Sequence, residues 1–290
     1  MSLSSMTGFA RATGEEAGHD WTWEIRSVNS KGLDIRCRLP SGLEGIESDV
    51  RGAVSACLGR GSVSLTLSCR RAAGATEIIV RDSHGSALNL LPEMLHRSAR
   101  LIRDWSGGPM SMMEGIDASY DAAIYVGYHA KAGTPNGVLD HTSSGDVTDI
   151  SVNGISMPET GYNALLAGYY DVPVVFVAGD KAVCDQARAL LGTVETVAVK
   201  EGIGAAAINL HPEVAREQIR AGVEKALRHL DDYQPYKLPA PYTMVLTLKT
   251  EQSIYNGDLY PGAKRTGDWE LTYVAQDVLE LMLAYRGMRR

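Results

Sequence analysis

The sequence has few cysteines, no excess of positive charge and no long apolar run. Its four cysteines (Cys37, Cys57, Cys69 and Cys184) include no C-x-x-C pair. Zinc-ribbon and redox motifs need that local spacing, so we expect small buried thiols instead. The 28 basic side chains are outnumbered by 35 acidic ones, which gives a net charge of −7. The chain therefore lacks the overall positive charge of a nucleic-acid-binding protein, and contact with nucleic acid is not expected.

No apolar run approaches the roughly 18–20 residues that a membrane-spanning helix needs. The opening residues, MSLSSMTGFARATGEE, show no signal-peptide pattern. We therefore expect a cytoplasmic protein that makes no membrane contact. Hydrophobic residues make up 44% of the chain and charged residues 22%, as in ordinary globular proteins. A chain of 290 residues is long enough for one large domain or two smaller ones.

Residues 4–71 are expected to form one unit. In DWTWEIRSVN, Trp21, Trp23 and Ile25 fall on one face of a predicted strand and polar residues on the other. The segment GLEGIESDV opens a predicted amphipathic helix that runs to about Leu58, and SVSLTLSCR alternates again as a strand. We therefore assign residues 1–71 to a small α+β N-terminal segment.

From Ala72 onward, strands alternate with helices. Buried strands are expected in EIIVR, AIYVGY, VPVVFVAGD and ETVAVKEG, and strands with alternating faces in YTMVLTLKT and DWELTYVAQDV. Helices are expected after Asp180, in HPEVAREQIRAGVEKALRHL, where Pro212 stands in the first turn, and in VLELMLAYRGM. This alternation predicts an α/β domain over residues 72–290, with a layered and mostly parallel sheet flanked by helices.

Side chains that can bind a metal ion follow three of these strands. Asp82 and His84 follow EIIVR, His129 follows AIYVGY, and Asp180 follows VVFVAG. His141 in GVLDHTSSG and Glu159 in MPETGYNALLAG lie between them in the chain, and Glu159 begins a predicted helix. Ligands of such sheets bind at the carboxyl ends of the strands. Imidazole and carboxylate groups are the ligands that zinc-like ions take.

Each of these residues has a structural alternative. A single histidine at the end of a strand is often part of a hydrogen-bonded turn, and Asp180 can equally cap the helix that follows it. Three histidines at similar positions, with a glutamate on the adjoining helix, favour a metal site. Composition and spacing alone therefore predict a metal-dependent α/β hydrolase.

The chain from about Ala72 to its end resembles the DppA-type D-aminopeptidase family. The matching phrases are AGATEIIVRDSHGSALNLLPE, SMMEGIDASYDAAIYVGYHAKAGTPNGVLDHT, NGISMPETGYNALLAGYYDVPVVFVAGD, AVKEG and PGAKRTGDWELTYVAQDVLE, and they come in the order of the family. The resemblance implies that His84, His129 and Glu159 are zinc ligands. It also implies that His141 is the catalytic histidine, which binds no metal and donates to the substrate carbonyl or the developing oxyanion.

The same resemblance implies an activity and an assembly. Members hydrolyse short peptides that begin with a D-amino acid, use two zinc ions and form ring-shaped decamers. For this chain we therefore expect a short peptide substrate, zinc as the cofactor and a homo-oligomer. Glu114, Asn153, Asn163 and Lys200 stand at points that a substrate can touch, although each is equally suited to a turn or a cap. Asn153-Gly154 is by itself a strong hairpin signal.

Residues 4–71 resemble the N-terminal segment of the YicC family, whose members are implicated as endoribonucleases. The matching phrases are SMTGFAR, WEIRSVNSKGLDIRCRLP and GRGSVSLTL. A DppA-type chain normally begins instead with a strand ending in D-x-E-G, whose Asp and Glu hold both metal ions. The nearest equivalent here, Leu43-Glu44-Gly45-Ile46, falls in the predicted helix. We therefore expect a domain that lacks its first metal-binding strand, binds one ion or none, and has impaired activity.

Two other classes of function remain open. One is RNA binding or cleavage through residues 4–71, where nine arginines and lysines accompany Trp21 and Trp23. A solvated basic surface on a core-forming fragment is the structural alternative to it. The other is a catalytically silent fusion that only assembles through its DppA-like surface.

Overall fold

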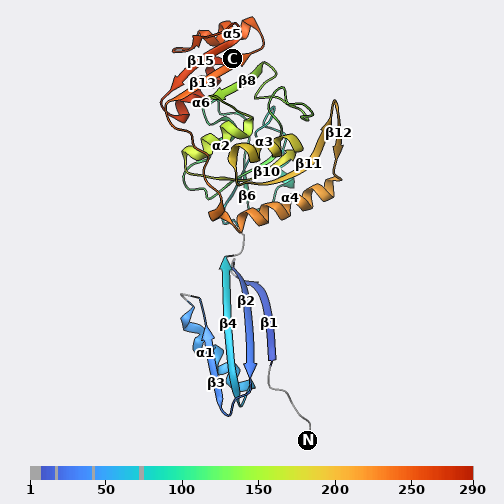
Figure 1. Cartoon of the computed structure of the whole chain (residues 1–290), viewed down its shortest axis with the longest axis vertical. Helices are drawn as coiled ribbons and strands as arrows, with labels where there is room; N and C mark the ends of the chain where they lie inside the picture. Colours follow the sequence, from blue (N-terminus) through green and yellow to red (C-terminus); the bar gives the residue numbers. More distant parts are fainter. Residues whose placement is uncertain (1–7, 17–18, 41–42, 72–74, 290) are drawn as a thin grey trace. The chain divides into compact units, whose positions relative to one another are not determined.

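The computed structural model describes residues 8–16, 19–40, 43–71 and 75–289. The chain divides into two compact units, Met1–Ala75 and Thr76–Arg290. Residues 72–74, which follow the boundary expected after Arg71, lie outside the described residues. Figure 1 shows the two units, the first in blue and the second in teal to red. No helix among the described residues is long and apolar enough to cross a membrane.

The N-terminal unit is a four-stranded sheet with a helix. Its strands stand in the order β1-β2-β4-β3, with bounds β1 Gly8–Glu16, β2 His19–Val28, β3 Leu33–Arg38 and β4 Gly61–Arg71. The 3-10 turn η1 (Glu44–Ile46) leads into α1 (Glu47–Cys57), which packs on β3. Val63, Leu65 and Leu67 alternate along β4 and are buried. The strands and helix predicted for this segment are thus confirmed.

The C-terminal unit contains a four-stranded sheet in the order β12-β11-β10-β7. The bounds are β7 Ala123–Tyr128, β10 Val174–Asp180, β11 Glu195–Ile203 and β12 Ala206–Asn209. β10 runs parallel to β7 and β11, and only β12 is antiparallel. All seven residues of β10 are buried, as in a strand covered on both faces. α3 (Lys181–Leu191) and α4 (Pro212–Leu227) both pack on β10 and β11.

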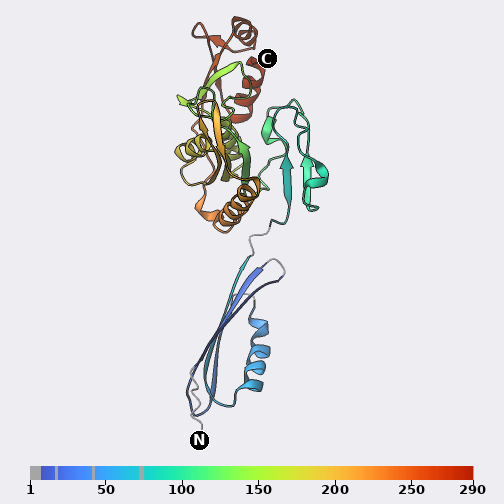
Figure 2. The same ribbon diagram turned by 90° about the vertical axis from the view of Figure 1, so that its right-hand side faces the viewer.

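Two short strands form a sheet of their own. β5 (Ile78–Arg81) pairs in parallel with β6 (Ala99–Ile102), and the pair is visible in teal in Figure 2. β7 is the edge strand of the larger sheet. Among the described residues, no strand pairing joins β5 to β7, so each has one side without a partner strand.

The chain closes in a five-stranded sheet, β14-β15-β13-β8-β9, that is antiparallel throughout. Its bounds are β8 Val147–Val152, β9 Ile155–Ser156, β13 Tyr242–Leu248, β14 Lys264–Arg265 and β15 Glu270–Ala275. α5 (Glu251–Asp258) and α6 (Val278–Met288) pack against β13 and β15. The α/β class is confirmed, whereas among the described residues of the C-terminal unit the parallel arrangement is limited to β7, β10, β11 and the β5–β6 pair. Alternating strands such as β13 bury one face, which suits antiparallel pairing.

Helix α2 (Glu159–Tyr169) joins these layers. Its first ten residues are buried, and it packs on β7, α3 and α6. Figure 1 shows it between the sheet that contains β10 and the red C-terminal elements. One apolar core runs from β7 and β10 across α2 to β13 and α6. Three further 3-10 turns complete the unit: η2 Pro92–Met94, η3 Ser111–Met113 and η4 Leu230–Asp232.

Candidate functional site

Three histidines converge at the carboxyl ends of β5 and β7. His84 follows β5, His129 directly follows β7, and His141 lies in the loop before β8. Ring nitrogens of all three lie within 4.8 Å of one another. The rings of His129 and His141 stack with centroids 3.9 Å apart, and His84 meets both edge-on at 5.7 Å and 5.4 Å. The structure thus brings together the three histidines that the strand-end pattern singled out.

Glu159 supplies a carboxylate to this cluster from the first turn of α2. Its Oε2 lies 3.5 Å from Nε2 of His129, and its Oε1 lies 3.7 Å from Nε2 of His141. The side chains of Glu159 and His129 are 4% and 7% exposed, so water is largely excluded between them. Pro158 precedes α2 in an extended conformation, and the helix begins at Glu159.

Backbone carbonyl groups fix which nitrogen of each ring faces the carboxylate. Nδ1 of His129 lies 3.2 Å from the carbonyl oxygen of Ala130, and Nδ1 of His141 lies 2.9 Å from that of Leu139. Because a carbonyl oxygen only accepts, Nδ1 must carry the proton in both rings. The lone pair of a neutral ring is therefore on Nε2, which faces Glu159. Metal-binding histidines are held in the same way by their second nitrogen.

This arrangement fits a cation. Nε2 of His129 is buried without a hydrogen-bond partner, although such atoms are rarely left unpaired in folded proteins. Two lone-pair nitrogens and two carboxylate oxygens facing one another repel unless a positive charge lies between them. Burial lowers the pKa of His129, against the attraction of Glu159, and so favours the neutral ring that binds metal. His84, His129 and Glu159 therefore offer donor groups suited to a zinc-like ion, and His141 lies beside them.

Residues that the sequence did not single out support the Glu159 carboxylate. The backbone N–H of Ser143 donates to its Oε1 at 2.7 Å. The Ser143 hydroxyl contacts the hydroxyl groups of Tyr162 on α2 and Tyr285 on α6, at 2.7 Å each. Tyr285 is 142 residues further along the chain. No local pattern marks these residues.

The two aspartates at the strand ends are held by hydrogen bonds of their own. Asp82 accepts the backbone N–H groups of Asn89 and Leu90 and so fixes the loop that carries His84. Burial alone would raise its pKa, but these bonds outweigh burial and the pKa is lowered. Asp180 caps α3 by accepting from Val183 N at 2.9 Å, which confirms the capping alternative.

Of the four predicted substrate-binding residues, Asn163 lies nearest to the cluster. It stands one turn after Glu159 on α2 and donates to the hydroxyl of Tyr128, the residue before His129. Its Oδ1 is buried without a partner. Glu114 accepts from the Ser106 hydroxyl.

The other two predicted contacts lie in the sheets. The side chain of Asn153 donates to Pro239 O at 2.9 Å and accepts from Thr243 N at 2.8 Å, which ties the β8–β9 turn to β13. The hairpin predicted at Asn153-Gly154 is confirmed. Lys200 lies on β11, opposite Asp180 in the strand register. Glu44, from the D-x-E-G lookalike, lies in η1 of the N-terminal unit, within the predicted helix.

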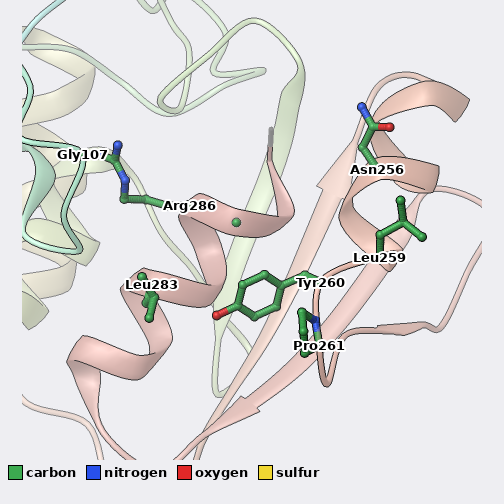
Figure 3. Close-up of a pocket in the computed structure, with 8 residues that line it drawn as sticks. Gly107, Asn256, Leu259, Tyr260, Pro261, Leu283 and Arg286 are labelled. Atoms are coloured by element: carbon green, nitrogen blue, oxygen red, sulfur yellow. The ribbon is translucent and has the colours of Figure 1, made fainter.

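A cavity of about 400 Å³ lies elsewhere, between α5 and α6. Figure 3 shows the side chains that line it, which include Leu259, Tyr260, Pro261, Leu283 and Arg286. None of the three histidines lines this cavity. Its Leu259 and Leu283 side chains are exposed apolar groups.

Known proteins match the C-terminal unit over most of its length. The peptidase M55 family, described as D-aminopeptidase, matches residues 60–286. A D-aminopeptidase of Bacillus subtilis is 37% identical over 219 residues, which cover 74% of this chain and 77% of that protein. The solved structure of the Zn-dependent D-aminopeptidase DppA from Bacillus subtilis, a self-compartmentalizing protease, has a TM-score of 0.72 at 35% identity. The match covers 74% of this chain and 79% of the DppA chain.

A second match covers the start of the chain. The family described as endoribonuclease YicC-like, N-terminal region, matches residues 3–104. A probable endoribonuclease YicC of Haemophilus influenzae is 38% identical over 65 residues, and this chain spans only 23% of that protein. Both resemblances drawn from the sequence are therefore confirmed. Because the larger match covers more than half of the chain, the protein belongs to the D-aminopeptidase family of hydrolases; the YicC-like match covers the start of the chain and shares residues 60–104 with it.

Proposed function

We propose that the C-terminal unit is a zinc-dependent aminopeptidase for short peptides that begin with a D-amino acid. The observation that carries the proposal is the cluster of His84, His129 and His141, in which the unpaired Nε2 of His129 faces the Glu159 carboxylate. The relatives support both the metal and the substrate class, since one of them is described as Zn-dependent and as a D-aminopeptidase.

The ligands in this proposal are His84, His129 and Glu159. When bound there, zinc supplies Lewis-acid polarisation of the peptide carbonyl and an acidified water. His141 is half-buried and keeps its Nδ1 bond to Leu139. With a second proton on Nε2, it can donate to the carbonyl oxygen of the substrate and stabilise the charge that develops there. Asn163 is our candidate for a substrate contact, because its buried Oδ1 has no protein partner.

We also propose that the ligand set is incomplete. The sequence has no D-x-E-G before β5, and in the described part of the chain β5 and β7 each have one edge without a partner strand. Both strands lead into the histidine cluster. A missing bridging carboxylate lowers metal affinity by more than the tenfold that commonly follows loss of a supporting residue. We therefore expect one zinc ion or none per chain, and reduced activity.

The test combines metal content with hydrolysis. Zinc per chain is measured by mass spectrometry, and release of D-alanine from D-Ala-D-Ala is measured with and without a chelator. We expect His129→Ala to lose most of the zinc and all turnover. We expect His141→Ala to retain the zinc and lose turnover. His229→Ala changes an exposed histidine of the same unit and is the matched control. Hydrolysis that survives both the chelator and His129→Ala would refute the proposal.

Self-association is part of the proposal. The relative is described as self-compartmentalizing, and exposed apolar side chains such as Leu259 and Leu283 are available for contact between copies. We propose a homo-oligomer, and a ring of ten subunits by analogy with the resembled family. Light scattering after size-exclusion chromatography measures the mass directly, and a monomer at micromolar concentration would contradict this part.

A second candidate function belongs to the N-terminal unit. Arg26, Ser64 and Arg36 stand side by side across β2, β4 and β3, on alternate positions to the buried Val63 and Leu65. Arg38 and Thr66 form the next row, and together with Arg26, Ser64 and Glu24 they line a hollow. The exposed Phe9 ring pairs with Arg26, whose guanidinium lies 5.5 Å from its centroid. Arginines beside an exposed aromatic ring on an open sheet suit single-stranded nucleic acid.

Binding of a fluorescent single-stranded RNA at several salt concentrations tests this candidate. We expect affinity to fall steeply with salt, and the double variant Arg26→Ala, Arg38→Ala to bind more weakly with a smaller salt slope. Arg60→Ala, an arginine outside these rows, is the control. Equal RNA affinity in the double variant and the wild type would contradict RNA binding by these rows and indicate a solvated basic surface.

A further inference from the structure

Ser143 lies between His141 and β8 in a backbone conformation that serine rarely adopts. Its φ angle is 63°, in the left-handed region that glycine and asparagine tolerate better. In this conformation its N–H donates to Oε1 of Glu159 at 2.7 Å. The other oxygen, Oε2, lies 3.5 Å from Nε2 of His129. Ser143 thus holds one oxygen of the carboxylate while the second faces a predicted metal ligand.

The hydroxyl of Ser143 joins two helices. Tyr285 OH donates to Ser143 Oγ at 2.7 Å, and Ser143 Oγ lies 2.7 Å from Tyr162 OH. Because the Tyr162 hydroxyl uses its one proton toward Met112, Ser143 Oγ is the donor to Tyr162. The Tyr162 hydroxyl in turn faces Sδ of Met112 at 3.7 Å. The hydroxyl chain therefore runs from α6, through the loop that carries His141, to α2.

Burial makes this hydroxyl chain a tight constraint. Tyr162 and Tyr285 are 2% and 1% exposed, and their rings lie 5.5 Å apart. Loss of one hydroxyl leaves a buried tyrosine hydroxyl without its full set of partners, which is unfavourable. The left-handed conformation of Ser143, unfavourable in itself, is thereby held in place.

We propose that Ser143 is a positioning residue, which Tyr285 and Tyr162 lock so that Glu159 presents Oε2 to the metal beside His129. This inference rests on the proposed function for its metal, but its residues lie outside the predicted ligand set. It assigns to the C-terminal helix α6 a role in metal affinity, although Tyr285 contacts none of the predicted ligands directly in the hydrogen bonds described. Supporting residues of this kind commonly change metal affinity by about tenfold to a hundredfold.

The test measures zinc and cobalt affinity in Tyr285→Phe and Ser143→Ala. Tyr285→Phe keeps the ring and removes only the hydroxyl. Tyr273→Phe is the matched control, because it removes a tyrosine hydroxyl that bonds to Glu280, in contact with neither His129 nor Glu159. We expect the metal dissociation constant to rise about tenfold in the first two variants and to stay within twofold in the control. The visible spectrum of bound cobalt is expected to change as well.

A crystal structure of metal-free Tyr285→Phe gives a readout that needs no metal. We expect the bond from Ser143 N to Glu159 to be lost or the carboxylate to be turned. An unchanged Glu159, or metal affinity equal to that of Tyr273→Phe, would overturn the inference. If Ser143→Ala does not fold, Tyr285→Phe decides alone. If Tyr285→Phe shows this structural response while the wild-type protein has no metal-dependent hydrolysis, the proposed function is refuted and the positioning role stands.

Discussion

His129 and Asp180 show how hydrogen bonding separates a candidate ligand from a structural residue. They lie at the ends of the paired strands β7 and β10. Both oxygens of Asp180 accept backbone N–H groups, from Val183 at 2.9 Å and Val138 at 2.6 Å. Nε2 of His129 has no hydrogen-bond partner. Both residues lie at the carboxyl ends of paired strands. The carboxylate of Asp180 is fully hydrogen-bonded and holds two loops, whereas Nε2 of His129 is available for a metal ion.

Cys184 offers a test of burial at the scale of one residue. Burial in α3 raises the pKa of its thiol from its ordinary value of 9.0 to about 11. The unfolded chain therefore loses this proton near pH 9, whereas the folded chain keeps it, and this group makes the free energy of unfolding fall as the pH rises between about 9 and 11. At pH 8 we expect iodoacetamide to modify the exposed Cys57 and to spare Cys184, as measured by peptide mass mapping. Equal labelling rates in the folded protein would contradict the prediction; in urea both should react.

Helix α2 packs closely against its neighbours because small residues face them. Gly168 lies against the backbone of Tyr236, where a Cβ atom would stand 2.0 Å from the carbonyl oxygen. Gly161 similarly faces Leu190 and Met157. These small residues allow the helix to be buried along nearly its whole length. The position of Glu159 at its first turn follows from that packing.

Gly168→Ala is therefore expected to destabilise the C-terminal unit by about 1–3 kcal/mol, the usual result of forcing extra volume into a packed core. The obstacle is backbone, so no side chain can rotate out of the way. Gly145→Ala is the control, because nothing lies within 4 Å of its added Cβ. Urea unfolding followed by tryptophan fluorescence and circular dichroism measures the difference. A midpoint for Gly168→Ala as high as that of the control would show that α2 has more freedom than the structure indicates.

At the scale of the whole molecule, the peptidase domain has two sheet edges that lead to its site. β7 exposes Val126 and Ile124, and β5 exposes Ile78, all of them residues with high preference for strands. Unpaired edges of this kind usually acquire a partner strand or are protected from one. The YicC-like segment precedes them in the chain, where the resembled peptidase family has a strand ending in D-x-E-G.

Replacing residues 1–75 by the N-terminal segment of the Bacillus subtilis relative tests the missing-strand hypothesis. We expect zinc to rise to two ions per chain and turnover on D-Ala-D-Ala to rise at least tenfold, because two carboxylate ligands return. A chimera whose D-x-E-G is changed to N-x-Q-G is the control for strand pairing without metal binding, and is expected to gain stability but not zinc. A chimera that equals the original chain in zinc content would show that the present ligand set is already complete.

Much of the fold was predictable because its elements carry strong local patterns. The apolar runs of β7 and β10, the Pro212 start of α4 and the Asn153-Gly154 turn are confirmed. β8 was not predicted, because the sequence VTDISV is short and places Asp149 in mid-strand. α5 was not predicted either, since its eight residues are mostly polar and packing supports them more than periodicity does.

The sequence by itself determined which residue types stand at the ends of strands, and therefore that three imidazoles and a carboxylate were candidates for one site. Only the tertiary structure decided that Nε2 of His129 and His141 faces Glu159, that Asp180 is used up as a cap, and that Tyr285 reaches Ser143. The physical reason is the separation along the chain over which each kind of interaction acts. Strand and helix preferences act between neighbours in the chain, whereas these contacts join residues up to 142 positions apart and form only when the sheets and α2 pack together.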